Sequence, residues 1–198
     1  MLSTTSDILH PPMHAGQDAL ASDPALSRYT YAIILTGALC WCAALALAPI
    51  LSAAGWSGAA DLLYQFFHRI CHQLEGRSLH LVGEPMAVCA RCSAIYAGFL
   101  VGTAIYPLFR SVATTALPPR MLLAGAVAPM LLDVLGGLLG VHEVTTVTRV
   151  VSGLIAGTLL PLFILPAAVG AVQQIAVARN PITISSTSEG LSDARETE

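Results

Sequence analysis

The sequence predicts an all-α membrane protein with about four transmembrane helices. Of its 198 residues, 55% are hydrophobic and only 11% are charged, and the mean hydropathy is +0.71. So few charges cannot cover the surface of a water-soluble domain of this length. The apolar residues are also collected into long runs, as in chains that cross a bilayer several times.

Four apolar runs are long enough to cross the hydrocarbon core as helices, because about 20 residues rising about 1.5 Å each span roughly 30 Å. The runs lack the alternation of a membrane barrel, and an isolated strand would leave its backbone unsatisfied in lipid. We therefore predict transmembrane helices at about 31–54, 87–109, 121–140 and 147–172. The flanking segments 1–30 and 176–198 are predicted to be flexible tails.

Small residues recur at four-residue spacing in the last three runs. This spacing lets helix backbones approach closely, and it favours packing within one chain over a dimer face. Pro129, Pro161 and Pro166 are expected to kink or end their helices. The small residues are Ala94, Gly98 and Gly102, then Gly136 and Gly140, then Gly153 and Gly157.

Arginine placement predicts the orientation, because cytoplasmic segments are richer in positive charge. With four spans drawn, Arg69 and Arg77 fall on one side, and a larger group falls on the other. We therefore expect a multi-pass protein of the inner membrane with both termini in the cytoplasm. The chain has no lysine and a net charge of -3, which argues against a nucleic-acid partner. The larger group is Arg28, Arg110, Arg120 and Arg179.

The connection between the first two spans is expected to hold an amphipathic helix at the membrane interface, over about 59–75. One face of this segment is apolar and the other is polar, and Gly76 is a natural stop. The apolar face carries Leu63, Phe66, Phe67, Ile70 and Leu74, and the polar face carries Asp61, Gln65, His68, His72 and Glu75.

The same connection and the start of the second span supply a set of metal-ligand side chains. Cys89 and Cys92 form a C-x-x-C pair one helical turn apart. Thiolates and imidazoles at such spacing suit zinc or a similar transition metal. Two ligand sets remain open: His68 with either Cys71 or His72 plus the C-x-x-C pair, or Cys71, His72 and the pair if the helix frays.

A redox function is the main alternative to metal binding. A C-x-x-C pair facing an oxidising compartment can cycle between dithiol and disulfide, with Cys71 as exchange partner and a quinone as electron acceptor. Arg91, between the two cysteines, would lower a thiol pKa. The plainest reading is a structural disulfide or inert buried thiols. Cys40 and Cys42 in the first span are expected to be small apolar residues in lipid.

A second group of polar residues lies within the spans. Asp133 is well inside the third span, and Arg149 begins the fourth. Unpaired charges there would cost several kcal/mol. With Arg91 they are expected to form a polar pocket beneath the Cys/His cluster. The pocket would either serve proton transfer or anion binding, or contain an Asp133 to Arg149 ion pair that only fixes helix packing.

Several of these residues together resemble a bacterial and archaeal family of membrane proteins catalogued as domain of unknown function 2085. The likeness covers roughly 59–157 and includes the Asp133 region. One departure is Ser93-Ala94, where Thr-Gly is expected. The family name implies no activity. The blocks that carry the resemblance are Cys71-His72-Gln73, the E-x-R-S run 75–78, Val88-Cys89-Ala90-Arg91-Cys92, Ile95-Tyr96-Ala97-Gly98 and Arg149-x-x-x-Gly153.

Three classes of function follow from these features. A metal-binding or sensing protein with a zinc-like ion at the extracytoplasmic face is the first, and a quinone-linked thiol oxidoreductase is the second. A small transporter is third, because the inner halves of the spans offer almost nothing ionisable for a polar path. The sequence does not indicate a substrate or an oligomeric state.

Overall fold

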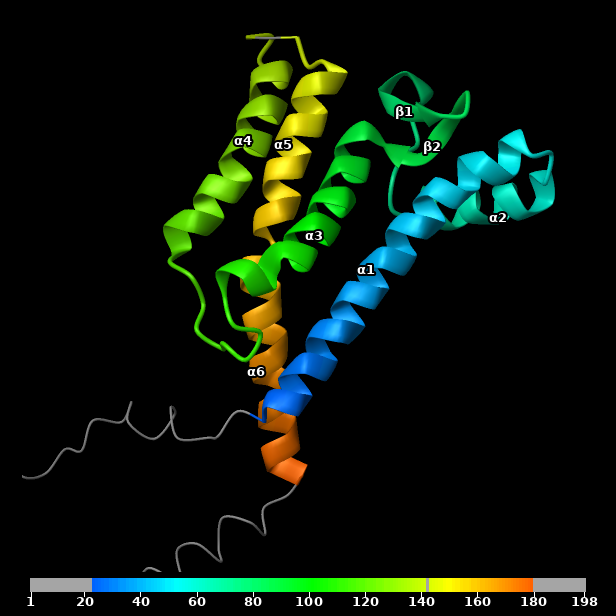
Figure 1. The fold of residues 1–198 in the computed structure, drawn as a ribbon. Coiled ribbons are helices and arrows are strands. Elements are labelled where there is room, and N and C mark those ends of the chain that lie inside the picture. Colours follow the sequence, from blue (N-terminus) through cyan, green and yellow to red (C-terminus); the bar gives the residue numbers. More distant parts are fainter. Residues whose placement is uncertain (1–22, 142, 180–198) are drawn as a thin grey trace, which may run out of the picture.

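The computed structural model describes residues 23–141 and 143–179 of the chain. Helices dominate it, and a short β-hairpin lies between the first two long membrane helices (Figure 1). In chain order the elements are α1 Pro24–Ala53, α2 Ser57–His68, the 3₁₀ turn η1 Glu75–Arg77, β1 Ser78–Leu81, β2 Glu84–Cys89, α3 Ala90–Phe109, α4 Arg120–Leu138, α5 Thr146–Leu159 and α6 Pro161–Arg179.

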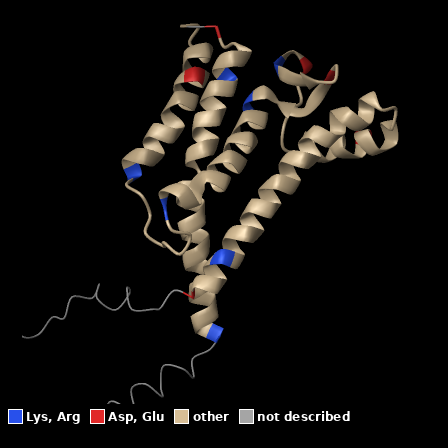
Figure 2. Cartoon of the chain, in the orientation of Figure 1, with Lys and Arg blue, Asp and Glu red and all other residues tan. Residues whose placement is uncertain are grey.

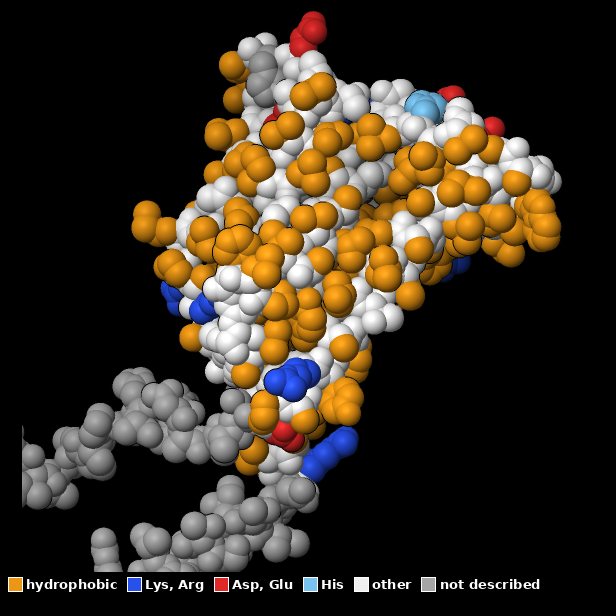
Figure 3. Space-filling view, viewed as in Figure 1, with side chains coloured by type: hydrophobic (Ala, Val, Ile, Leu, Met, Phe, Trp, Pro, Cys, Tyr) orange, Lys and Arg blue, Asp and Glu red, His pale blue; other side chains and the backbone are white. Residues whose placement is uncertain are grey.

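Four segments are long and apolar enough to cross a membrane: α1, α3, α4 and the joined pair α5 and α6. This confirms the predicted fold class. α1 has 30 residues, which gives a length of about 45 Å and exceeds a hydrocarbon core of roughly 30 Å. Hydrophobic side chains cover most of the face seen in Figure 3, as contact with lipid requires.

α1 begins earlier than predicted because Asp23 caps it. Asp23 Oδ1 accepts a hydrogen bond from the Ala25 N–H at 2.9 Å, and Pro24 opens the first turn. The predicted N-terminal tail, 1–30, is therefore wrong from Pro24 onward. The predicted C-terminal tail is likewise too long, since α6 continues to Arg179. The remainders of both tails lie outside the described residues.

The predicted fourth span, 147–172, consists of two helices. α5 ends at Leu159, Leu160 caps it, and α6 starts at Pro161. Proline has no N–H to continue the α-helical ladder, so the chain changes direction at this residue. Pro161 thus ends a helix as predicted, whereas Pro129 and Pro166 lie within α4 and α6.

The predicted interfacial helix is shorter than expected, because α2 ends at His68 and does not reach 75. The Ile70 and Cys71 N–H groups both donate to the Phe67 carbonyl, which closes the last turn. The chain then leaves the helix, and Gln73 adopts a left-handed φ of 49°. The longer helix was predicted because Ile70 and Leu74 continue the helical spacing of apolar residues. In the structure these two residues lie in an irregular segment after α2.

A β-hairpin follows, which was not predicted from the sequence. β1 and β2 are antiparallel, and their two-residue turn places Val82 at φ 55° and Gly83 at φ 85°. Positive φ at both positions is the geometry of a tight hairpin turn. β2 ends at Cys89, so the second membrane helix begins at Ala90 and not at 87.

α3 and α5 pack in parallel with their backbones almost in contact. A Cβ added at Gly98 would lie 2.8 Å from the Leu154 carbonyl, and one at Gly153 would lie 2.7 Å from the Arg91 carbonyl. The Cβ atoms added at Gly102 and Gly157 would also collide with backbone of the facing helix. The glycines of α3 and α5 therefore serve packing within the chain, as predicted, whereas a Cβ added at Gly140 after α4 would meet open space.

The two ends of the helix bundle differ in charge (Figure 2). α1 begins and α6 ends at the same end, where the connection between α3 and α4 also lies (Figure 1). The opposite end carries α2, the hairpin and the connection between α4 and α5. The first end holds the arginines near helix termini, namely Arg28, Arg110, Arg120 and Arg179.

Candidate metal centre

Three cysteine thiols meet at the end of the bundle that carries the hairpin. Cys71 follows α2, Cys89 ends β2 and precedes α3, and Cys92 lies in the first turn of α3. Their Sγ atoms all lie within 4.8 Å of one another. Cys71 is buried, and the other two are half-buried. Thiols from two segments 18 residues apart thus form one cluster.

Hydrogen bonds between side chains and backbone groups fix this arrangement. The Gln73 side-chain amide donates to the Tyr64 carbonyl at 2.7 Å and to the Ala87 carbonyl at 2.8 Å. It therefore ties the segment after α2 both to that helix and to β2. The Cys89 N–H donates to Cys71 Sγ at 3.2 Å. Hydrogen bonds from backbone N–H groups stabilise sulfur as thiolate.

A hydrophobic cluster supports the thiols from below. Phe67 and Val88 are fully buried next to Cys71, and Leu45 and Ala48 of α1 complete this core. Trp41 of α1 packs edge-on against the Phe67 ring at 5.3 Å between centroids. α1, α2 and β2 are thereby held around the cysteines.

The thiol of Cys89, just before α3, has a lowered pKa. Its pKa is lowered to about 5, chiefly because the Cys92 thiol donates a hydrogen bond to its sulfur. Burial raises the pKa, but the backbone N–H of Cys92, the Cys71 thiol and the N–H of Arg91 lower it further. Cys89 is therefore a thiolate at neutral pH, the form that binds metals and attacks disulfides.

The two predicted histidine ligands do not join the thiols. Within the described residues the group contains no His, Asp or Glu side chain. His68 is the exposed last residue of α2, and the early end of that helix separates it from Cys71. His72 is exposed and borders the same pocket as the thiols without reaching them.

A pocket of about 440 Å³ opens beside the cluster. Arg77 lines it; from the sequence this residue had entered only the charge distribution and the E-x-R-S block of the resemblance. Gln73 was likewise quoted only as part of the resemblance; a polar residue next to the Cys71-His72 pair is the one signal that pointed to it. The pocket is lined by Ile70, Cys71, His72, Gln73, Leu74, Arg77, Cys89 and Cys92.

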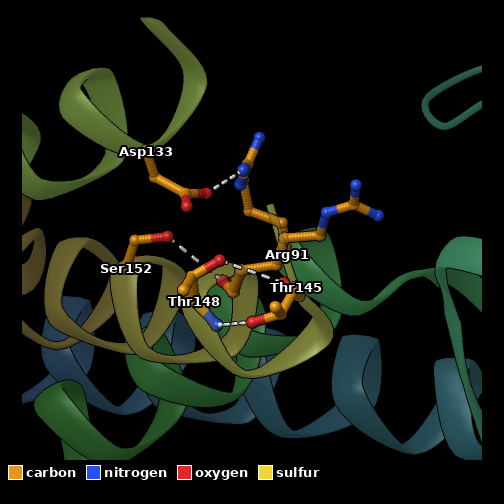
Figure 4. A network of polar contacts seen from close by, with 6 residues as sticks. Arg91, Asp133, Thr145, Thr148 and Ser152 are labelled. Carbon is orange, nitrogen blue, oxygen red and sulfur yellow. Dashed lines mark hydrogen bonds and ion pairs between the residues drawn. The ribbon is translucent and has the colours of Figure 1, made fainter. Parts of the chain in front are cut away.

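The predicted polar pocket within the spans is partly assembled. Arg91 of α3 forms an ion pair with Asp133 of α4, and this carboxylate is 6% exposed (Figure 4). The sequence had suggested Arg149 as the partner of Asp133. Within the described residues Arg149 forms no ion pair; its backbone carbonyl accepts a hydrogen bond from the Ser152 hydroxyl at 3.3 Å.

The ion pair connects the thiol turn to the α4–α5 hairpin. Arg91 stands between Cys89 and Cys92, so its backbone belongs to the C-x-x-C turn while its side chain reaches α4 (Figure 4). At the start of α5, the Thr145 hydroxyl accepts from the Thr148 N–H at 3.2 Å and caps that helix. The polar side chains of this region thus mostly join two helices or form hydrogen bonds with the backbone of their own helix.

Comparison with known proteins places the chain among membrane proteins without an assigned activity. Residues 71–163 match the family described as Predicted membrane protein (DUF2085). The uncharacterized protein MJ1492 of Methanocaldococcus jannaschii is 36% identical over 141 residues, which cover 69% of this chain and 90% of that protein. No solved structure is significantly similar to the chain.

The matched segment contains the three cysteines of the cluster and both partners of the Arg91–Asp133 ion pair. It begins at Cys71 and includes the C-x-x-C turn, Asp133 and Arg149. The extent and identity of the match agree with the resemblance carried by the cysteine blocks. The chain therefore belongs to the family of predicted membrane proteins known as domain of unknown function 2085.

Proposed function

We propose that this protein binds a transition-metal ion, zinc or one similar to it, through Cys71, Cys89 and Cys92. The observation that carries this proposal is the mutual approach of three sulfur atoms within 4.8 Å. In a tetrahedral site with metal–sulfur bonds of about 2.3 Å, sulfurs stand about 3.8 Å apart. Small side-chain rotations would bring the three thiols to that spacing.

The surroundings of the sulfurs also favour a metal over plain packing. The Cys89 N–H donates to Cys71 Sγ, as expected for a sulfur that carries negative charge. Inert buried cysteines have no need of such a donor. The ion would supply the positive charge that three neighbouring thiolates require, and it would join α3 to the segment after α2.

The charge difference between the two ends of the bundle supports an extracytoplasmic site. The end away from the thiols carries four arginines and one described carboxylate, Asp23, whereas the arginines of the thiol end are outnumbered by acidic residues. The first end would face the cytoplasm. Both termini would then be cytoplasmic, and the chain would be a multi-pass protein of the inner membrane.

Metal analysis of the detergent-purified protein tests the proposal. We expect one equivalent of bound metal per chain and its loss in the Cys89→Ser and Cys92→Ser variants, because two thiolates hold such an ion far more weakly than three. Cys40→Ser is the matched control, since Cys40 is exposed in α1 outside the cluster. A metal-free wild-type protein with reduced thiols would contradict the proposal.

A thiol–disulfide oxidoreductase is the second candidate, favoured by the acidic Cys89 thiol beside two others. Two thiols would lose two electrons and two protons and form one disulfide, while a quinone would take up both and become the quinol. Thiol counting before and after reduction separates the candidates. A reducible Cys89–Cys92 bridge in protein without metal would select this one.

A further inference from the structure

We propose that the ion in the thiol cluster keeps one coordination position for an exogenous small anion, which enters through the pocket lined by Arg77. This inference rests on the proposed metal site and concerns its fourth ligand. Zinc-like ions take four ligands, and sites with three protein ligands leave the fourth position to water or substrate. The described residues supply three.

His72 is the nearest candidate for a fourth protein ligand, and its neighbours hold it away. Burial alternates along the segment: Cys71 and Gln73 point inward, whereas His72 and Leu74 are exposed. Two hydrogen bonds from the Gln73 amide pin that residue to α2 and β2. Turning the His72 imidazole onto the sulfurs would strain a segment that these bonds fix.

The space next to the thiols suits a small polar ligand. The pocket beside them has a volume of about 440 Å³ and is bordered by all three cysteines. An ion bound by the three sulfurs would therefore have one side facing this pocket. An open side of this kind is typical of a catalytic or exchange site, whereas structural sites are closed by protein.

The charge at the pocket favours an anion. Arg77 supplies a cation at its exposed wall; its backbone N–H donates to the Leu74 carbonyl at 2.9 Å, which places the residue at the end of η1. The amino terminus of α3 adds the positive end of a helix dipole to the same cluster. Together they offset the negative charge that three thiolates leave on a divalent ion.

Cobalt substitution tests the inference, because Co²⁺ reports both its thiolate ligands and its coordination number by absorption. We expect intense thiolate-to-cobalt bands in the full chain, and a saturable change of the visible ligand-field bands upon titration with azide. His72→Ala should leave both spectra unchanged. Arg77→Gln should weaken azide binding about three- to ten-fold, as removal of one nearby charge predicts.

Arg69→Gln is the matched control, since Arg69 is exposed at the end of α2 and does not line the pocket. It should leave azide binding unchanged. Absence of thiolate-to-cobalt bands would refute the proposed function itself. If azide does not alter the ligand-field bands and His72→Ala changes the spectrum, the metal site is supported but the open coordination position is refuted. Equal azide binding in wild type and Arg77→Gln would overturn the role of Arg77.

Discussion

At the scale of single residues, the site depends on side chains that act on the thiols from outside the cluster. Gln73 holds the segment of Cys71 against β2, and Arg91 ties the turn between the other two cysteines to α4. Neither residue is a metal ligand. Both place sulfur atoms where backbone N–H groups and a helix terminus stabilise thiolate, so the acidity of Cys89 comes from its surroundings.

The lowered pKa of Cys89 predicts a distinctive pH profile of alkylation. In the metal-free, reduced protein the thiolate is the main form above pH about 5. We expect its rate with iodoacetamide to be nearly constant between pH about 6.5 and 8, whereas an ordinary thiol with a pKa near 8.5 gains about ten-fold per pH unit there. Mass spectrometry of the Cys89 peptide measures the rate, and a steep rise over this range would contradict the prediction.

Asp133→Asn should destabilise the fold, because it leaves the Arg91 guanidinium without its ion-pair partner near the membrane. Asp133 is 6% exposed and Arg91 20% exposed, so we expect a loss of about 2–4 kcal/mol in the free energy of unfolding. Equilibrium unfolding in detergent measures the loss. Asp61→Asn, at an exposed position of α2, is the control and should change little. Equal stability of the two variants would show that the ion pair contributes nothing.

At the scale of elements, the contact between α3 and α5 positions the thiol turn within the bundle. Gly153 of α5 faces the Arg91 carbonyl, so the closest approach of the two helices begins directly at the C-x-x-C turn. The hairpin then brings Cys71 toward this turn from the other side, through the Ser78 to Cys89 pairing. The cluster therefore lies where a tight helix pair and a small sheet converge.

Gly157→Ala should separate α3 from α5, because the added methyl group would collide with the Ile95 backbone. Backbone cannot move aside as a flexible side chain does, so we expect a loss of at least about 2 kcal/mol in the free energy of unfolding. Gly125→Ala in α4 is the control; its new methyl group meets open space, and alanine favours helix by up to about 1 kcal/mol. The prediction fails if the two variants unfold alike in detergent.

At the scale of the whole molecule, the helices separate two chemically different ends. One end receives both described chain ends and carries four arginines with a single described carboxylate, Asp23, while the other carries the thiol cluster, the hairpin, α2 and most of the acidic residues (Figures 1 and 2). The first end would face the cytoplasm by the distribution of positive charge. Solutes on the extracytoplasmic side of the membrane would then have access to an ion at the opposite end.

Added cysteines test this orientation in intact cells. Ser57→Cys, at the start of α2, should react with a membrane-impermeant maleimide, whereas Ser111→Cys, after α3, should not. Both serines are exposed in the structure, so burial does not explain a difference. Labelling is counted as the increase over the parent chain, which has 5 cysteines. The reverse pattern would place the thiol cluster in the cytoplasm and weaken the redox candidate as well.

Composition and hydrophobic period alone predict the membrane class, the number of spans and the use of small residues for packing within the chain. These properties follow from local composition and period, because a bilayer imposes one length and one hydrogen-bonding rule on every crossing segment. The C-x-x-C pair could also be identified from the sequence, since its two thiols are only three residues apart along the chain.

Only the tertiary structure decided which side chains meet those two thiols. Cys71 joins them and His68 does not, because α2 stops at His68 and a hairpin folds the chain back, where the apolar period had indicated a longer helix. Arg91, and not Arg149, pairs with Asp133 because the packing of both α3 and α4 against α5 brings the Arg91 side chain to that carboxylate. Such partners lie far apart along the chain, and their meeting depends on turns and helix orientations that no local period encodes.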